Sequence, residues 1–255
     1  MRRLLLVCLL LAVGSAANLA AQEAPLLTVL PRQELARQLE LRGDLQMIRK
    51  NYWQAVDLYQ EAFRLTPNNS VLLNKTGIAY HQLSQLKDAK KYYERATKLD
   101  KTYAQAWNNL GAVHYARKDY KKAIRYYQRA LEFSPAQAAI RGNLGAALFA
   151  RKKYDEALEE LRLALLLNPE IFQQRNLFGI LMQDYSVEDR ARFHFLLAKS
   201  FALLGNVESC LFYLRRALED GFPPQDAQPD PAFFLVSEDR RFQELFAAPP
   251  TALKP

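Results

Sequence analysis

Five of the nine glycines recur at a constant interval. They are Gly43, Gly77, Gly111, Gly145 and Gly179, and each follows the preceding one by 34 residues. A period of this length is the sequence signature of stacked helical hairpins. The 255 residues are therefore expected to form an array in which each layer contacts its neighbours, rather than one central core.

Two sets of alanines keep the same interval. They are Ala55, Ala89, Ala123 and Ala157, followed by Ala62, Ala96, Ala130 and Ala164. Small residues at fixed places let two helices approach closely, while larger side chains fill the space between layers. Each unit is therefore expected to hold two helices. The turns that join them are expected around Asn51, Gln85, Asp119 and Lys153.

The composition excludes several other classes of protein. Hydrophobic residues make up 50% and charged residues 24%, so wholesale disorder is excluded. Two cysteines, Cys8 and Cys210, are too few for a disulfide-stapled domain or a four-cysteine zinc site. The sequence has no G-x-S-x-G, H-E-x-x-H or phosphate-loop motif. We therefore expect no catalysis, no cofactor, no bound metal and no small-molecule substrate.

Residues 1–21 have the pattern of a secretory signal peptide. Arg2 and Arg3 form a positive head, residues 4–13 are apolar, and small residues follow up to Ala21. The apolar run is short for a bilayer span, and an uncleaved membrane anchor is the alternative. Cleavage would lower the net charge from +8 to +6. We expect a protein exported to a bacterial periplasm or beyond, with residues 22–35 as a lead-in.

Residues 104–135 resemble a tetratricopeptide repeat (TPR) closely. The residues at the signature places of that family are Trp107, Leu110, Gly111, Ala123, Tyr127, Ala130 and Pro135. Units at 36–69, 70–103 and 138–171 match more loosely, and Arg141 stands at the tryptophan place of the last one. The resemblance implies an all-α fold, a right-handed α-solenoid whose first helices line a concave groove. In this family the groove holds a peptide or a helix of a partner.

The pattern changes after residue 169. Gly179 keeps the register, so residues 172–184 are expected to form an additional first helix, and Ser186 is expected to N-cap the next one. Residues 187–204 and 207–219 are expected to form a fifth helix pair. In that pair the small residues of the repeat are replaced by Ala198, Cys210 and Ala217.

The segment 221–255 differs in composition, because it holds seven of the twelve prolines. The prolines exclude a long helix. Ser237 is expected to N-cap a short helix over residues 238–246, with apolar residues on one face. Because the end of an array exposes apolar surface, we expect this segment to cap it.

The register places several polar residues on the inner face that the resemblance implies. The candidates for peptide contact are Asn74, Lys75, Asn108, Asn109, Arg141, Asn143 and Asn176. An asparagine amide both donates and accepts, so it can pair with the backbone of an extended peptide. Lys75 and Arg141 are expected to add positive charge. The alternative for Asn109 and Asn143 is that asparagine is habitual at this place in the family.

Basic residues gather at the turns between paired helices. This basic ridge consists of Arg49, Lys50, Arg117, Lys118, Lys121, Lys122, Arg151, Lys152 and Lys153. Stacking at a constant period aligns the turns along one edge. Such a ridge suits an anionic lipid surface, at roughly 1 kcal/mol per basic residue, or an acidic partner. The alternative is a solvated edge, and no base-reading motif indicates nucleic acid.

These observations favour a non-enzymatic scaffold that binds a peptide or partner protein in its groove. Acidic Glu40 and Asp44 stand at places where TPR domains that grip a C-terminal carboxylate carry basic or amide residues, so that type of ligand is excluded. The alternative function is a membrane-surface adaptor that acts through the basic ridge. His81, His114 and His194 are expected to pack or form hydrogen bonds inside the array.

Overall fold

A computed structural model describes residues 31–172 and 186–251, which contain helices and turns but no strand. The first four pairs are α2 (Arg32–Ile48) with α3 (Tyr52–Leu65), α4 (Ser70–Gln82) with α5 (Leu86–Leu99), α6 (Ala104–Ala116) with α7 (Tyr120–Phe133), and α8 (Ala138–Ala150) with α9 (Tyr154–Leu167). The later elements are α11 (Val187–Leu203), α12 (Val207–Glu219), α13 (Pro224–Ala227), the 3-10 helix η1 (Pro231–Phe233) and α14 (Arg240–Ala247).

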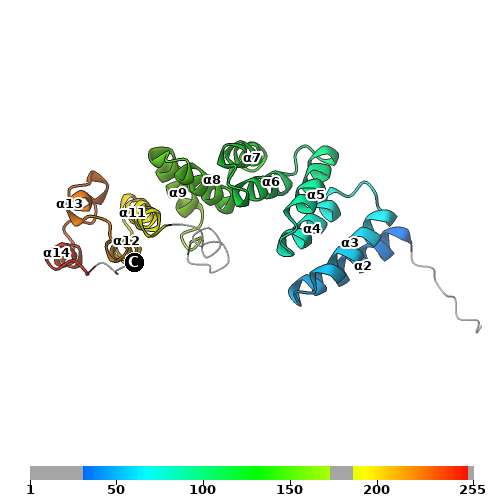
Figure 1. Ribbon diagram of the computed structural model, residues 1–255, viewed down its shortest axis with the longest axis horizontal. Helices are drawn as coiled ribbons and strands as arrows, with labels where there is room; N and C mark the ends of the chain where they lie inside the picture. The colour runs from blue at the N-terminus through cyan, green and yellow to red at the C-terminus, as the bar shows by residue number, and fades with distance from the viewer. Residues whose placement is uncertain (1–30, 173–185, 252–255) are drawn as a thin grey trace, which may run out of the picture.

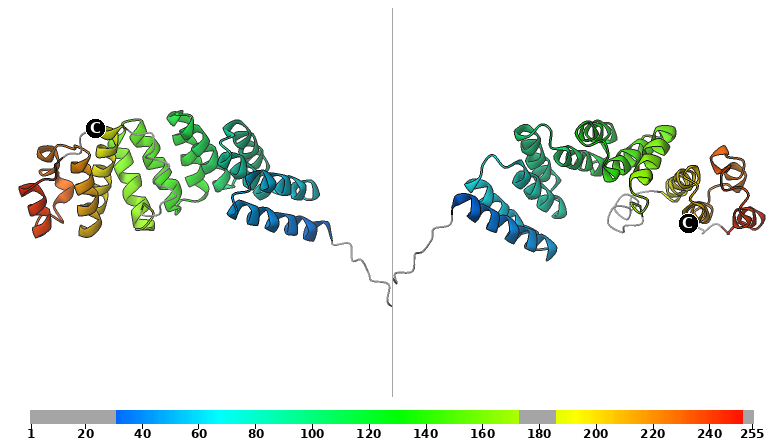
Figure 2. Two further views of the ribbon diagram at one scale, coloured as in Figure 1. Left: turned by 60° about the horizontal axis from the view of Figure 1, so that its bottom comes forward. Right: turned by 180° about the vertical axis from the view of Figure 1, so that it is seen from behind.

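The pairs stack into a curved row (Figure 1). From α2 to α9 each helix packs against the next one in the chain, and the further views show the same row of layers from below and behind (Figure 2). The first helices of successive units also contact one another, α4 with α6 and α6 with α8. They therefore form the inner layer of the arc, with α5 and α7 outside it. The predicted all-α solenoid is confirmed.

In each of the first four units a glycine of the first helix contacts a large side chain of the second helix. A Cβ atom on Gly43, Gly77 or Gly111 would lie 2.4–2.5 Å from the ring of the tyrosine 16 residues later. These rings belong to Tyr59, Tyr93 and Tyr127, and each is buried. The fourth unit has Leu161 opposite Gly145, at 2.9 Å from the same position. Only glycine lets the paired helices approach this closely, which explains why glycine recurs at the same place in each unit.

The alanines of the repeat lie in the same interfaces. All eight, from Ala55 to Ala164, are fully buried. Proline or lysine follows the second helix of each unit, at Pro67, Lys101, Pro135 and Pro169. The predicted helix over residues 172–184 and Gly179 lie outside the described residues.

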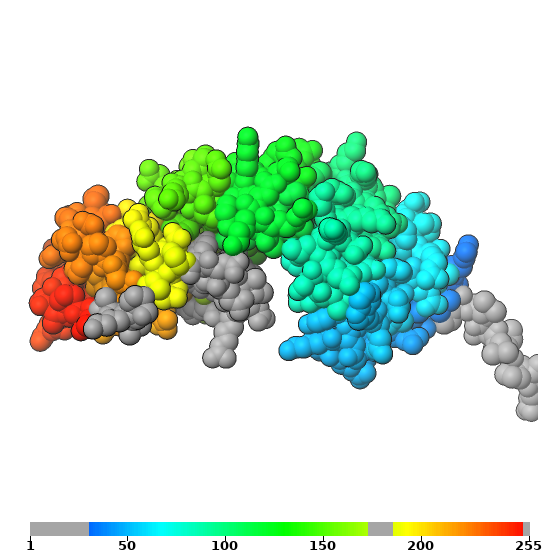
Figure 3. Space-filling model, in the orientation of Figure 1, coloured from blue at the N-terminus to red at the C-terminus, as the bar shows by residue number. Residues whose placement is uncertain are grey.

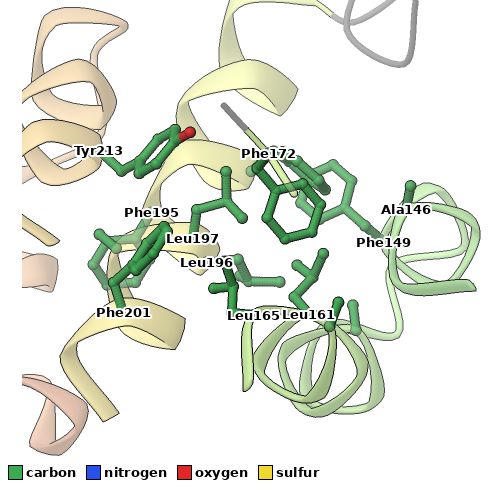
Figure 4. Close-up of a cluster of buried hydrophobic side chains, with 14 of the residues drawn as sticks. Ala146, Phe149, Leu161, Leu165, Phe172, Phe195, Leu196, Leu197, Phe201 and Tyr213 are labelled. Atoms are coloured by element: carbon green, nitrogen blue, oxygen red, sulfur yellow. The ribbon is translucent and has the colours of Figure 1, made fainter. Parts of the chain in front are cut away.

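The helix α11 continues the array by packing directly on α9. The rings of Phe149 and Phe193 meet edge to face at 4.9 Å between centroids. Leu161 and Leu165 of α9 point toward the α11 side chains in the same cluster (Figure 4). In the fifth pair Cys210 is buried, and burial raises the pKa of its thiol to about 12. This thiol is therefore a packing group.

The C-terminal elements cover the last helix pair. The 3-10 helix η1 contacts α11 and α14 contacts α12, and Phe233, Phe242 and Leu245 are buried in the shared core. The expected N-cap of α14 was wrong by two residues. Asp239 accepts a hydrogen bond from the backbone N–H of Arg241 at 2.8 Å, whereas the Ser237 hydroxyl donates to the carbonyl of Phe234.

The N-terminal end of the array differs from the internal units. The helix α2 begins at Arg32, so residues 32–35 of the predicted lead-in are helical. The equivalent places in the next three units, 66–69, 100–103 and 134–137, form the turns between units. The predicted lead-in and the first helix therefore overlap by residues 32–35. None of the helices in the described part of the chain is long and apolar enough to cross a bilayer.

We predict that Gly111→Ala lowers the free energy of unfolding by about 1–3 kcal/mol, because the new methyl group overlaps the Tyr127 ring. The matched control is Gly142→Ala, where the nearest ring atom would be 3.3 Å away rather than 2.5 Å, so the ring has to yield far less and the loss of stability should be smaller. Urea unfolding of both variants measures the difference. Equal stability of the two variants would contradict the close approach.

Candidate functional site

Residues 35 positions apart meet across each junction between inner helices. The side-chain amide of Asn109 donates to Asn74 Oδ1 at 2.9 Å, and that of Asn143 donates to Asn108 Oδ1 at 3.0 Å. The preceding junction has the same spacing, with Lys75 Nζ 2.7 Å from Glu40 Oε1. The candidate residues are therefore cross-links between units as well as surface groups.

The two amide pairs join into one chain, which we call the asparagine ladder. Asn108 Nδ2 donates to Asn109 Oδ1 at 3.3 Å, and Asn74 Nδ2 donates to the Tyr103 hydroxyl at 3.4 Å. The ladder consists of Asn74, Asn108, Asn109 and Asn143. It runs along α4, α6 and α8, the inner helices of the arc. The space-filling view shows that the row of layers is hollowed on its lower side (Figure 3).

The ladder members differ in accessibility. Asn74 is buried, with 4% of its surface exposed, and it anchors the ladder to Tyr103. Asn108, Asn109 and Asn143 are half-buried. An amide has two N–H donors and an oxygen with two lone pairs, so each of these three has capacity for a further partner. The surface available to a ligand is therefore centred on α6 and α8.

The ladder pattern changes at the fourth unit. Gly142 stands 34 residues after Asn108, and a Cβ atom there would lie 3.3 Å from the Phe172 ring. Glycine at this place therefore makes room for an aromatic side chain that packs on α8. Asn176, the next candidate in the register, lies outside the described residues.

The positive charge expected at Lys75 is compensated. Its ammonium lies 2.7 Å from Glu40 and 2.8 Å from Asp44, and the Tyr59 hydroxyl donates to Asp44 at 2.7 Å. Burial lowers the pKa of Lys75, but hydrogen bonds to the two carboxylates outweigh this effect and raise it overall. Two carboxylates face one ammonium, so this end of the inner surface is acidic.

The positive charge expected at Arg141 is also engaged inside the fold. Its Nε donates to the carbonyl of Pro135 at 3.1 Å, and its guanidinium lies 2.9 Å from Glu160. Trp107, 34 residues earlier, donates from Nε1 to the carbonyl of Lys101 at 2.8 Å. Arg141 thus reproduces the hydrogen bond of the tryptophan that it replaces.

The spacing of 35 identifies three further residues of the site. Glu40, Asp44 and Tyr103 complete the hydrogen-bond network of the candidates. The signal was present in the sequence, because Glu40 and Lys75 have the same separation as Asn74 and Asn109. Matching residues within the 34-residue register alone does not reveal it.

The basic ridge is exposed but interrupted. All nine of its residues are exposed, and two of them pair with acids, Lys122 with Asp119 and Lys153 with Glu156. In the second unit residues 83–85 are Leu, Ser and Gln, so the turn there carries no charge. The ridge is therefore two patches, one at the first unit and one at the third and fourth.

The turns of the ridge hold their central residue in a left-handed conformation. Lys50, Lys118 and Lys152 have φ of 60–61°, and Ser84 has 59° in the second unit. In the third unit the backbone N–H of Lys118 donates to the carbonyl of Tyr115 at 2.8 Å, and the N–H of Asp119 donates to the carbonyl of His114 at 2.9 Å. These hydrogen bonds cap the C-terminus of α6. The fifth pair has Gly205 at this place, with φ of 69°.

Two of the three histidines are buried, and His81 is half-buried. His114 is buried against Tyr126, with 5.2 Å between ring centroids, and burial lowers its pKa. His194 Nδ1 lies 2.9 Å from Asp220, which also pairs with Arg190. Burial lowers the pKa of His194 despite that carboxylate. Within residues 31–172 and 186–251, no three His, Cys, Asp or Glu side chains form a group that would hold a metal ion.

Sequence comparisons identify the repeats. Profiles described as tetratricopeptide repeat match residues 104–136 and 138–171, and a profile described as TPR repeat matches residues 77–117. No curated protein matches the sequence. With the packing of the helix pairs, these matches show that the chain belongs to the tetratricopeptide repeat family.

Solved structures share the fold. A crystal structure of MamA protein superposes with a TM-score of 0.51 at 21% identity, covering 73% of this chain and 92% of that one. A MamA structure from Desulfovibrio magneticus RS-1 has a TM-score of 0.52 at 18% identity, covering 76% of this chain and 97% of that one. At these identities the likeness concerns the solenoid architecture alone.

We predict that Lys118→Gly raises the free energy of unfolding by about 1 kcal/mol, because glycine adopts a positive φ without the steric cost that lysine pays. The matched control is Lys121→Gly, three residues later and inside α7, where glycine should destabilise by about the same amount. Chemical denaturation measures both. A loss of stability in both variants would contradict the strained turn.

Proposed function

We propose that the protein is a non-enzymatic scaffold that binds an extended segment of a partner protein along the asparagine ladder. The observation that carries this proposal is the pair of amide cross-links 35 residues apart at consecutive junctions of the inner layer. Three half-buried amides lie in one hydrogen-bonded line there. Their remaining donors and acceptors suit the N–H and C=O groups of an extended backbone.

The hydrogen bonds within the ladder support this role. A side chain that is already held in place loses less conformational entropy when a ligand binds. Asn143 and Asn109 are each fixed by a bond to the preceding inner helix. Backbone recognition tolerates varied side chains in the partner, and the excess of carboxylate at Glu40 and Asp44 favours a basic residue at that end.

The test begins with peptides selected from a random 12-residue display library against the whole protein. Asn143→Ala should weaken a selected peptide at least tenfold, which corresponds to about 1.4 kcal/mol. Gln128→Ala, on the outer helix α7, is the control and should change the affinity less than twofold. Isothermal titration calorimetry measures the dissociation constants. If the selected peptides bind Asn143→Ala as tightly as the original protein, peptide binding along the asparagine ladder is refuted.

A second function, as an adaptor on anionic membranes, is favoured by the lysines of the turns. A residue with positive φ carries a steric cost that glycine avoids, yet three of the four turns have lysine there. Strain of this kind is retained where the side chain is useful. Lys118 and Lys152 project from adjacent units, and Arg117 and Arg151 precede them. We propose that this patch contacts anionic headgroups.

Flotation with phosphatidylserine vesicles tests this second function. Binding should weaken as salt rises and should be lost when Lys118, Arg151 and Lys152 are replaced by glutamate together. Replacing Lys87, Lys91 and Lys98 of α5 by glutamate gives a control with the same change of net charge. If both triple variants lose binding equally, the attraction is general and the patch has no special role.

The place of action that we propose is outside the cytosol, because residues 1–21 have the signal-peptide pattern. N-terminal sequencing of the protein from the producing cells tests this. A chain that retains Met1 and Arg2 in the cytosolic fraction would contradict export.

A further inference from the structure

A pocket of about 450 Å³ lies where α5, α6 and α7 meet. The half-buried rings of Trp107 and Tyr126 line it, together with the buried Leu110. The other lining residues come from the end of α5, the turn that follows it and α7. None of the lining residues belongs to the asparagine ladder or to the basic ridge. We call this hollow the Trp107 pocket.

The repeat carries a small polar residue at this pocket. Thr97 lines it, and the residues 34 positions before and after Thr97 are Phe63 and Leu131. Both of these apolar side chains pack against buried clusters. The Thr97 hydroxyl instead donates to the carbonyl of Glu94 at 3.1 Å, within its own helix. The second unit therefore lacks the apolar side chain that its two neighbours have at this place.

The preceding unit shows what fills the equivalent place. Phe63 packs with Leu73 in a cluster that Tyr92 also joins. The residues 34 positions after Leu73 and Tyr92 are Trp107 and Tyr126, which line the pocket. The pocket therefore has the surroundings of a phenyl ring without the ring. Its volume suffices, because a cavity of roughly 150 Å³ accommodates benzene.

An arginine accompanies the aromatic residues in both units. The guanidinium of Arg95 lies 5.3 Å from the centroid of the Phe63 ring. Its equivalent, Arg129, lines the pocket, lies 5.9 Å from the centroid of Trp107 and pairs with Glu132. Guanidinium groups attract the faces of aromatic rings. An aromatic side chain is therefore a better match for the pocket than an aliphatic one.

Two ammonium groups border the pocket without an acidic partner among the described residues. They belong to Lys98 and Lys101, which are both exposed. The lining carboxylate of Glu94 pairs with Lys90 at 3.1 Å. Lys101 stands where the neighbouring units have a proline, so charge is added at a place where the repeat carries none. These charges favour a ligand with carboxylates beside its ring.

We propose that the Trp107 pocket binds an aromatic side chain of a partner protein, in a segment that has carboxylates on both sides of the ring. The ring takes the place that Phe63 fills in the preceding unit, and the carboxylates pair with Lys98 and Lys101. The single carboxylate of a small aromatic acid would leave one of these ammonium groups unmatched. This site does not depend on peptide binding along the asparagine ladder.

The fluorescence of Trp107 provides a direct readout. The chain has two tryptophans, and Trp53→Phe removes the other one, which is 54% exposed on α3. The probe is an acetylated and amidated pentapeptide with phenylalanine at its centre and two aspartates on each side. We expect a saturable change in Trp107 emission. The affinity should fall at least tenfold when alanine replaces the phenylalanine, and it should weaken as salt rises.

Variants of the protein define the site. Thr97→Phe supplies the residue of the first unit and should weaken binding at least tenfold, because its ring occupies the pocket. Lys98→Glu should weaken binding at least fivefold, and as a surface change it keeps the test valid if Thr97→Phe unfolds. The matched control is Lys87→Glu, about 16 Å away along α5, which should alter the affinity less than twofold. Circular dichroism melting checks that each variant is folded.

Several results would overturn the proposal. They are an unchanged Trp107 emission, equal affinity for the peptide with a central alanine, and undiminished binding to folded Thr97→Phe. Phenylacetate that binds as tightly as the pentapeptide would assign the pocket to small aromatic acids instead. Asn143→Ala should leave the affinity for the pentapeptide unchanged, so failure of this pocket and failure of the asparagine ladder are distinguishable.

Discussion

The close approach of glycine to a large side chain within each unit fixes the geometry of the whole array. At Gly43, Gly77, Gly111 and Gly145, a Cβ atom would lie within 2.4–2.9 Å of a tyrosine ring or a leucine side chain. No larger residue fits there without a shift of the neighbouring side chain. The two helices of a unit are thereby held at one separation, and fully buried alanines hold each unit against the next. Because every layer has the same thickness, the same side-chain contacts recur along the arc.

The inner surface follows from that regularity. A constant layer brings a residue of one inner helix against the residue 35 positions later, so Glu40 meets Lys75 and Asn108 meets Asn143. The first junction is ionic and the next two are amide pairs, which gives the arc an acidic end and a neutral middle. The inner surface therefore presents positioned hydrogen-bond donors and acceptors, whereas His114, His194 and Cys210 are buried inside the fold.

The fold was predictable from sequence because it depends on residues that repeat at one interval. The site was predictable only in part. The register indicated which residues lie inside, but it treated Lys75 and Arg141 as sources of charge, whereas carboxylates and a carbonyl engage both. Such pairings cross between units and depend on side-chain reach. The start of α2 at Arg32 and the N-cap of α14 at Asp239 also differed from the boundaries expected from sequence.

Titration of a selected peptide into the ¹⁵N-labelled protein, followed through the side-chain amide resonances, tests the central claim most directly. The amides of Asn109 and Asn143 should shift together as the peptide saturates. The amide of Asn206, which caps α12, should stay in place. Saturation with no change at Asn108, Asn109 or Asn143 would contradict recognition through the ladder.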